Sequence, residues 1–115
     1  MTDSILDSIK EMIGPGNYDM FETDLIIHIN SAIGIATQVG IGPQDGFFIT
    51  GSTETWSDFI TNDEKKALEF VKTFIYLKCR LYFDPPQSGV ATDAMEKMAN
   101  ELIWRMEVAA HKYGT

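Results

Sequence analysis

The side chains best suited to catalysis in this sequence are Cys79 and the two histidines, His28 and His111. A cysteine beside a histidine can act as an activated nucleophile in acyl transfer, provided that the fold brings the two together. Cys79 lies within an apolar stretch, which favours a buried structural thiol. His28 lies at the edge of an apolar helix face, where a hydrogen-bonded structural histidine is the ordinary role. We therefore expect no nucleophile pair.

Three acids form a second candidate group, because Asp58, Asp63 and Glu64 lie close together in the sequence. Paired carboxylates can serve as general acid and general base. Asp63 and Glu64 are also the acids expected in the first turn of a helix that Asn62 caps. A small enzyme that uses His28 or Asp58 remains the third-ranked hypothesis for this chain.

Cofactor and metal motifs are missing from the sequence. It has one cysteine, no pair of histidines spaced for one helix face, and no calcium-binding loop. Gly40, Gly42 and Gly46 follow a predicted helix rather than a strand, and no Gly-Lys-Ser/Thr follows them, so they do not form a phosphate loop. We predict no catalytic, cofactor-binding or metal-binding residue, and we expect that the protein is not an enzyme.

The composition is that of one small acidic domain. The chain has 115 residues, is 44% hydrophobic and carries a net charge of -8, which fits a single domain with a real core. We expect neither a membrane span nor a leader peptide. Residues 1–64 hold 11 acids and one base, a charge of -10, whereas residues 65–115 hold 8 bases and 6 acids, a charge of +2. The acid excess argues against a protein that grips DNA phosphates, and the uneven division suits a subunit with oriented neighbours.

Apolar periodicity predicts an all-α fold, a compact bundle of about four helices. The predicted helices cover 3–13, 23–39, 62–83 and 92–112, with Ser4, Thr23 and Asn62 as N-caps of the first three. The long loop 44–61 between the second and third helices is predicted to hold one short strand at 46–51 or a helical turn at 56–59.

The two C-terminal helices differ in how much of their surface is apolar. The third is apolar over a wide arc that includes Cys79 and Tyr82, so we expect it to be central. The fourth has a narrower core stripe, formed by Met95, Met98, Ala99, Leu102, Ile103, Met106, Ala110 and Tyr113.

Several residues do not fit a simple core and are candidates for binding another chain. Trp104, with Val108 one turn later, projects from the polar face of the last helix; it is either an interface anchor or packed under the loop 44–61. Lys78 falls inside the apolar arc, so it either extends its ammonium group to the edge or pairs with an acid on its own chain or on a neighbouring subunit. Ile27 adds an apolar group on the back of the second helix.

The sequences of these segments resemble those of the head-tail connector family of tailed bacteriophages and prophages, also called adaptor or DNA-packaging proteins. The stretches that carry the resemblance are IIHINSA at 26–32, QVGIGP at 38–43, WSDF at 56–59, VKTFIYLKCRLYFDPP at 71–86 and ELIWR at 101–105. Their order and spacing extend over nearly the whole chain. The resemblance implies one connector-like helical domain over residues 1–115.

The resemblance also implies a structural role in the virion, at the head-tail junction, for a protein made in the bacterial cytoplasm. Such proteins form a closed, dodecamer-like ring under the portal, contact the portal protein and a tail-completion or stopper protein, and let DNA pass without specific binding. It implies no cofactor and no membrane. The interface candidates are Ile27, Lys78, Trp104, Arg105 and Val108, of which the last three would lie near the portal. The alternative is a monomeric acidic regulator or DNA mimic.

Overall fold

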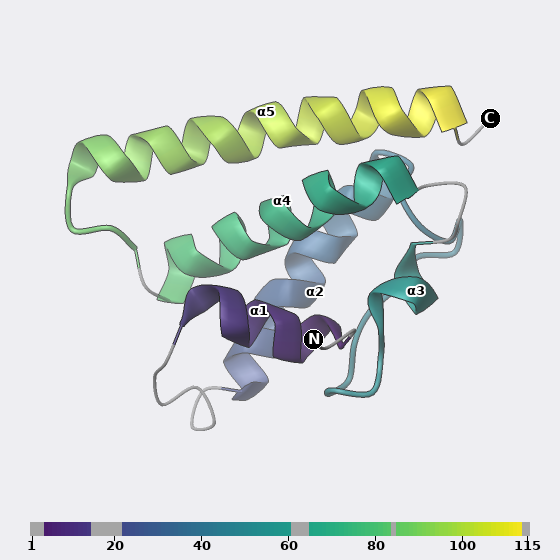
Figure 1. The fold of residues 1–115 in the computed structure, drawn as a ribbon, viewed down its shortest axis with the longest axis horizontal. Coiled ribbons are helices and arrows are strands. Elements are labelled where there is room, and N and C mark those ends of the chain that lie inside the picture. Colours follow the sequence, from purple (N-terminus) through teal and green to yellow (C-terminus); the bar gives the residue numbers. More distant parts are fainter. Residues whose placement is uncertain (1–3, 15–21, 61–64, 84, 114–115) are drawn as a thin grey trace.

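Five helices make up the fold of this computed structural model, which describes residues 4–14, 22–60, 65–83 and 85–113 (Figure 1). The helices are α1 (Ile5–Ile13), α2 (Glu22–Gln38), α3 (Trp56–Phe59), α4 (Lys65–Phe83) and α5 (Gly89–Tyr113). No strand occurs in the described ranges, and the predicted all-α class is confirmed. Asn62 and the acids Asp63 and Glu64 lie outside the described residues, so the predicted cap of α4 lies there too.

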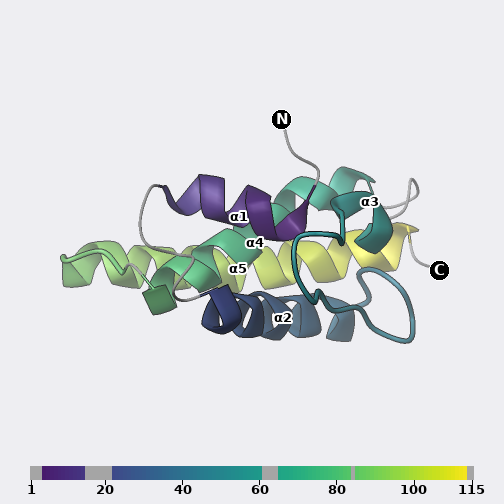
Figure 2. The same cartoon turned by 90° about the horizontal axis from the view of Figure 1, so that it is seen from below.

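The centre of the molecule is α4, which contacts α1, α2 and α5 (Figure 2). The prediction of a central third helix is therefore confirmed. Its buried side chains point to several neighbours at once; they are Ala67, Val71, Phe74, Ile75, Leu77 and Cys79. The longest helix, α5, lies along α4 at the edge of the molecule (Figure 1).

Hydrogen bonds join the start of α1 to the segment around α3. Ser4 caps α1 as predicted, because its side-chain oxygen accepts the Asp7 backbone N–H at 3.2 Å. Ser4 also forms an isolated antiparallel bridge with Thr55. The buried Trp56 donates its indole N–H to Ser8 Oγ at 3.1 Å. The predicted turn at 56–59 is thus the helix α3, and it is fixed on α1.

The long loop is held in place by one side chain of α2. The Asn30 amide donates to the Ile49 carbonyl at 3.0 Å and accepts the Ile49 N–H at 2.7 Å. These two bonds occupy the backbone groups that a neighbouring strand would have used. The predicted strand at 46–51 is therefore wrong, although the Ile49 side chain is buried as a strand residue would be.

The turn that leads from α2 into the long loop is shaped by Gly42. Its φ of +83° lies in the left-handed region, and a Cβ placed there would overlap the ring of Phe59, 2.4 Å from Cε1. Only glycine fits this position without displacing the buried Phe59 ring.

A carboxylate closes the tip of the same loop. Glu54 accepts the Thr50 hydroxyl at 2.7 Å, the Thr50 N–H at 3.0 Å and the Gly51 N–H at 3.4 Å. The bond from the Thr50 hydroxyl, with those from the backbone, favours the charged carboxylate and lowers the pKa of Glu54 to about 2.

Two helix starts differ from the sequence prediction. The second helix includes Thr23 and begins at Glu22, so Thr23 is not its N-cap. The last helix begins at Gly89 rather than near Thr92, because Ser88 supplies the cap: its Oγ accepts the Ala91 N–H at 3.3 Å and its carbonyl accepts the Thr92 N–H at 3.0 Å.

Two side chains predicted to be apolar contacts of the bundle are exposed instead. Met98 lies beside the buried stripe of α5 rather than within it, because Ala99, Leu102 and Met106 are the residues that face α4. Tyr82, near the end of α4, is also exposed and stacks on His28 of α2. The remaining described members of the predicted α5 stripe are buried or half-buried.

Replacing Gly42 should destabilise the protein. We expect Gly42→Ala to lower the free energy of unfolding by at least about 1–3 kcal/mol, because the new Cβ meets both an unfavourable φ and the Phe59 ring. Urea unfolding followed by tryptophan fluorescence measures this. The control is Gly34→Ala in α2, where a Cβ meets nothing within 4 Å and should raise stability by about 0.5–1 kcal/mol. Equal stability of Gly42→Ala and wild type would contradict the packing described.

The loop carboxylate makes stability depend on pH in acid. Because the folded pKa of Glu54 is depressed to about 2 from an ordinary value of 4.5, its charged form stabilises the fold above pH 4.5, and this contribution is lost as the pH falls toward 2. The difference in unfolding free energy between wild type and Glu54→Gln should therefore shrink steadily over that interval. A difference that stays constant from neutral pH to pH 2 would show that the carboxylate charge has no such role.

Candidate interaction surface

The outward side of α5 carries a line of exposed apolar side chains. Val90 is 81% exposed, Trp104 61% and Val108 46%. Val90 and Val108 are about five helical turns apart and so point in the same direction, with Trp104 one turn before Val108. We call these three residues the α5 line. The opposite side of α5 is buried against α4, so Trp104 does not pack under the loop 44–61.

Arg105 lies next to the α5 line but is directed to the side of the helix. Its guanidinium group pairs with Glu101 one turn earlier at 3.2 Å and lies 6.0 Å from the ring centroid of Phe70 on α4. These contacts are exposed and add little to stability. They hold the arginine at the edge of the surface that Trp104 occupies.

Ile27 lies on α2, away from the α5 line, and 55% of its surface is exposed. The neighbouring His28 turns toward α4 and stacks on Tyr82, with ring centroids 4.4 Å apart and an angle of 12° between the planes. His28 therefore belongs to the contact between α2 and α4, as the sequence interpretation of a structural histidine proposed.

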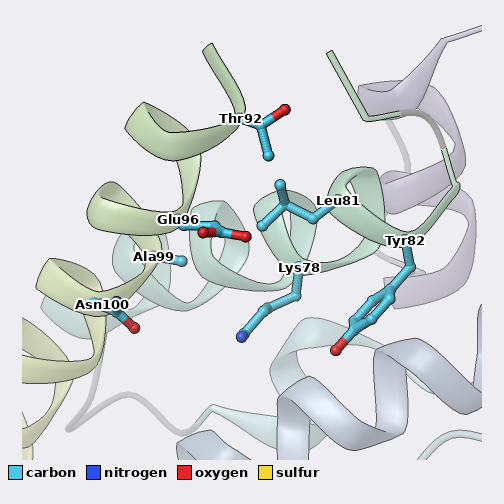
Figure 3. A pocket seen from close by; sticks show the side chains of 7 residues that line it. All are labelled: Lys78, Leu81, Tyr82, Thr92, Glu96, Ala99 and Asn100. Atoms are coloured by element: carbon cyan, nitrogen blue, oxygen red, sulfur yellow. The ribbon is translucent and has the colours of Figure 1, made fainter. Parts of the chain in front are cut away.

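Lys78 lines a pocket of about 290 Å³ between the C-terminal part of α4 and the N-terminal part of α5 (Figure 3). The other lining residues are Leu81, Tyr82, Thr92, Glu96, Ala99 and Asn100. The ammonium group of Lys78 lies 6.0 Å from the Phe74 ring centroid, and the side chain is half-buried. The Lys78 side chain thus extends out of the apolar arc into the pocket.

The residues of the enzyme hypothesis are not brought together around this pocket. Its lining contains no histidine, cysteine or aspartate. Asp58 accepts the Thr55 N–H at 3.0 Å and completes the capping box of α3. The side chain of His111 lies outside the described residues. Within the described ranges, no group of three or more potential metal-ligating side chains occurs.

Cys79 is fully buried in the core around α4. Burial disfavours the thiolate and raises the pKa of Cys79 to about 12. At neutral pH the group is an unreactive thiol, which fits the structural role expected from its apolar surroundings.

The five predicted interface residues therefore do not form one patch. Trp104, Arg105 and Val108 lie together near the C-terminal end of α5, whereas Ile27 is on α2 and Lys78 is at the pocket. Besides Met98 and Tyr82, sequence reasoning also missed the exposure of Val90 and Phe48. Val90 was placed outside the helix by the wrong start at Thr92. Phe48, which is 66% exposed in the loop, was assigned to a strand that does not form.

The fold is thus an all-α bundle in which one side of the long helix α5 is exposed. The chain matches the family model described as phage connector protein over residues 5–113, a span that includes all five helices. The chain belongs to the phage connector protein family. The same comparisons gave no match to a characterised protein and none to a solved structure.

Family membership makes this chain a head-tail connector, a structural component of a phage virion. It confirms the resemblance that the segments at 71–86 and elsewhere indicated. None of the helices in the described ranges is long and apolar enough to cross a membrane.

The two tryptophans of this connector should differ in their effect on the stability of the monomer. We expect Trp104→Ala to change the unfolding free energy by less than about 0.5 kcal/mol, because its side chain is largely in solvent. Trp56→Ala, which empties a buried site and removes the bond to Ser8, should cost about 3–5 kcal/mol. Chemical denaturation of dilute protein, followed by circular dichroism, checks both. Comparable losses for the two variants would mean that Trp104 belongs to the core.

Proposed function

We propose that this connector assembles as a closed ring beneath the portal, where it joins the head to tail components and extends the channel through which DNA passes. The α5 line carries the proposal. Trp104 and Val108 are exposed on a helix whose other side packs against α4, and a protein gains from covering such apolar groups with a partner. In a head-tail connector, the available partners are its own copies and the neighbouring virion proteins.

The exposed groups lie on two different faces, so one chain can contact two kinds of neighbour at once. The α5 line lies on the side of α5 that faces away from α4, whereas Ile27 lies on α2, below α4 in Figure 1. An interface in which two different faces meet generates a ring when the rotation between subunits closes. The proposed ring is dodecamer-like in size.

Each candidate residue has a proposed partner. Trp104, Arg105 and Val108 contact the portal protein, since they are grouped at one end of α5. Ile27 and Lys78 contact the adjacent subunit. A tail-completion or stopper protein binds the opposite side of the ring.

The acidity of the chain is compatible with a channel for DNA. Of the 17 acids, 11 lie in residues 1–64 together with a single base. A channel wall of like charge weakens the adhesion of DNA phosphates, which favours sliding over binding. The proposed role needs no catalysis and no cofactor. The same net charge of -8 also suits a monomeric acidic regulator or DNA mimic, which is the alternative function.

The proposed ring is tested by the mass of the assembled protein. We expect this chain to shift from monomer to one large species as its concentration rises. Alternatively, the large species forms only when the portal protein of the same phage is present. Trp104→Ala should raise the concentration needed for portal binding by about tenfold or more, the loss typical of an interface anchor. Light scattering and co-sedimentation with the portal measure the two effects.

Met12→Ala is the matched control, because Met12 is an exposed apolar residue of α1 outside the proposed contacts. This variant should assemble and bind like wild type. A chain that stays monomeric at every concentration and does not bind the portal would contradict the ring and favour the monomeric regulator.

A further inference from the structure

The outward side of α5 carries more than the three residues of the α5 line. Exposed positions follow one another along it at alternating steps of four and three residues: Val90, Ala94, Lys97, Glu101, Trp104 and Val108. This is the spacing of the a and d positions through which two α-helices pack along their length. We call these six residues the α5 seam. The seam is about 27 Å long, at the helical rise of about 1.5 Å per residue.

A second helix has free access to the seam. In Figure 1, α5 runs along the edge of the molecule, and the other helices all lie on the side of α4. All six seam residues are exposed, whereas the opposite side of α5 is buried against α4. A helix lying along the seam would therefore cover the apolar groups at both of its ends without meeting the rest of the described chain.

The sequence of the seam is symmetric about position 99, so two copies of α5 can pair in opposite directions. A two-fold axis at this position brings each seam residue opposite the one that lies equally far beyond the axis in the second copy. Val90 then lies opposite Val108, and the small Ala94 lies opposite the large Trp104. Small side chains that face large ones allow the two layers to interdigitate.

The two charges at the middle of the seam fix the direction of this pairing. In the antiparallel pair, Lys97 of each copy lies opposite Glu101 of the other, which gives attraction on both sides of the axis. In a parallel pair in register, Lys97 would meet Lys97 and Glu101 would meet Glu101, so like charges would repel. Arg105 of the same chain already pairs with Glu101 at 3.2 Å and holds this carboxylate at the seam.

Other features of the seam make the contact reversible. Charged residues in the middle of a helix seam set the register at a cost in stability. Asp93 and Glu107 lie along one edge of the seam, where their like charges oppose the pairing. Met98, which is 50% exposed, lies along the other edge close to the axis and adds apolar contact. An interface formed by one helix from each copy is also small, as weak and transient interfaces are.

We propose that, before it reaches the portal, this chain forms a weak two-fold dimer in which two copies of α5 pack antiparallel along the α5 seam. The occupant is a second copy of this chain, because the seam is complementary to itself in charge and in side-chain size. The dimer goes beyond the proposed ring. It covers Trp104 and Val108, which the proposed function assigns to the portal, so the two contacts exclude each other. It corresponds to the case in which the large species forms only when the portal is present.

Reversing one charge at the centre of the seam tests the dimer. Lys97→Glu places acids opposite each other across the axis, and Glu101→Lys places bases there. Each variant should need about tenfold or more higher concentration to dimerise than wild type. The first variant makes the net charge of -8 more negative and the second makes it less negative, so an effect of net charge alone would move the two in opposite directions. Sedimentation equilibrium without the portal measures the dissociation constants.

Two combinations of these variants should restore the dimer. A chain that carries both Lys97→Glu and Glu101→Lys has the same charge pairs in exchanged positions and should dimerise like wild type. An equimolar mixture of the two single variants should form a mixed dimer, which native mass spectrometry identifies when one variant carries an isotopic label. Glu11→Lys, a charge reversal at an exposed position of α1, is the matched control and should dimerise like wild type. Circular dichroism should show every variant folded.

The outcomes separate the dimer from the proposed function. If wild type stays monomeric until the portal is added, or forms the ring directly without it, the dimer is wrong while the proposed function stands. If a dimer forms but both single variants dimerise like wild type, or the double variant is as weak as the single ones, the antiparallel seam is overturned. If the losses and their rescue occur as expected but the chain neither forms a ring nor binds the portal, the dimer stands and the proposed function fails.

Discussion

The packing of α4 against three other helices is the constraint on which the rest of this structure depends. Because α1, α2 and α5 all contact α4, its buried side chains form the core and fix the positions of the surrounding elements. α5 has 25 residues and α4 has 19, and α5 packs mainly through one side. The other side of α5 is left for a partner. The exposure of Trp104 and Val108 is thus a consequence of how the core is built.

Much of the fold follows from local sequence physics. The wide apolar arc of α4, the Ser4 cap and the turn that begins at Trp56 were all predictable, because each depends on residues close together in the chain. The loop was not, since its conformation is set by Asn30, a polar residue on a distant helix that bonds to Ile49. The start of α5 was misplaced because the helix is capped by Ser88, four residues before Thr92.

The interaction surface was predictable to a smaller degree. Helical geometry alone places Trp104 and Val108 outside the core, and the structure agrees. Phe48 gave no comparable signal, because its direction depends on neighbours that are buried through long-range contacts, Phe47 against Phe59 and the Ile49 side chain in the core. The pocket beside Lys78 is formed by two helices, so no spacing within one of them indicates it. Exposed groups on different elements become a site only when a second chain is considered.

The central claim is that copies of this connector form a closed ring in which the exposed side of α5 meets the portal. The most direct measurement is an electron cryo-microscopy reconstruction of the assembled protein on the portal of its phage. The predicted result is a closed ring in which Trp104 is covered by the portal. A bound protein that forms no ring, or a ring in which Trp104 faces solvent, would contradict the claim.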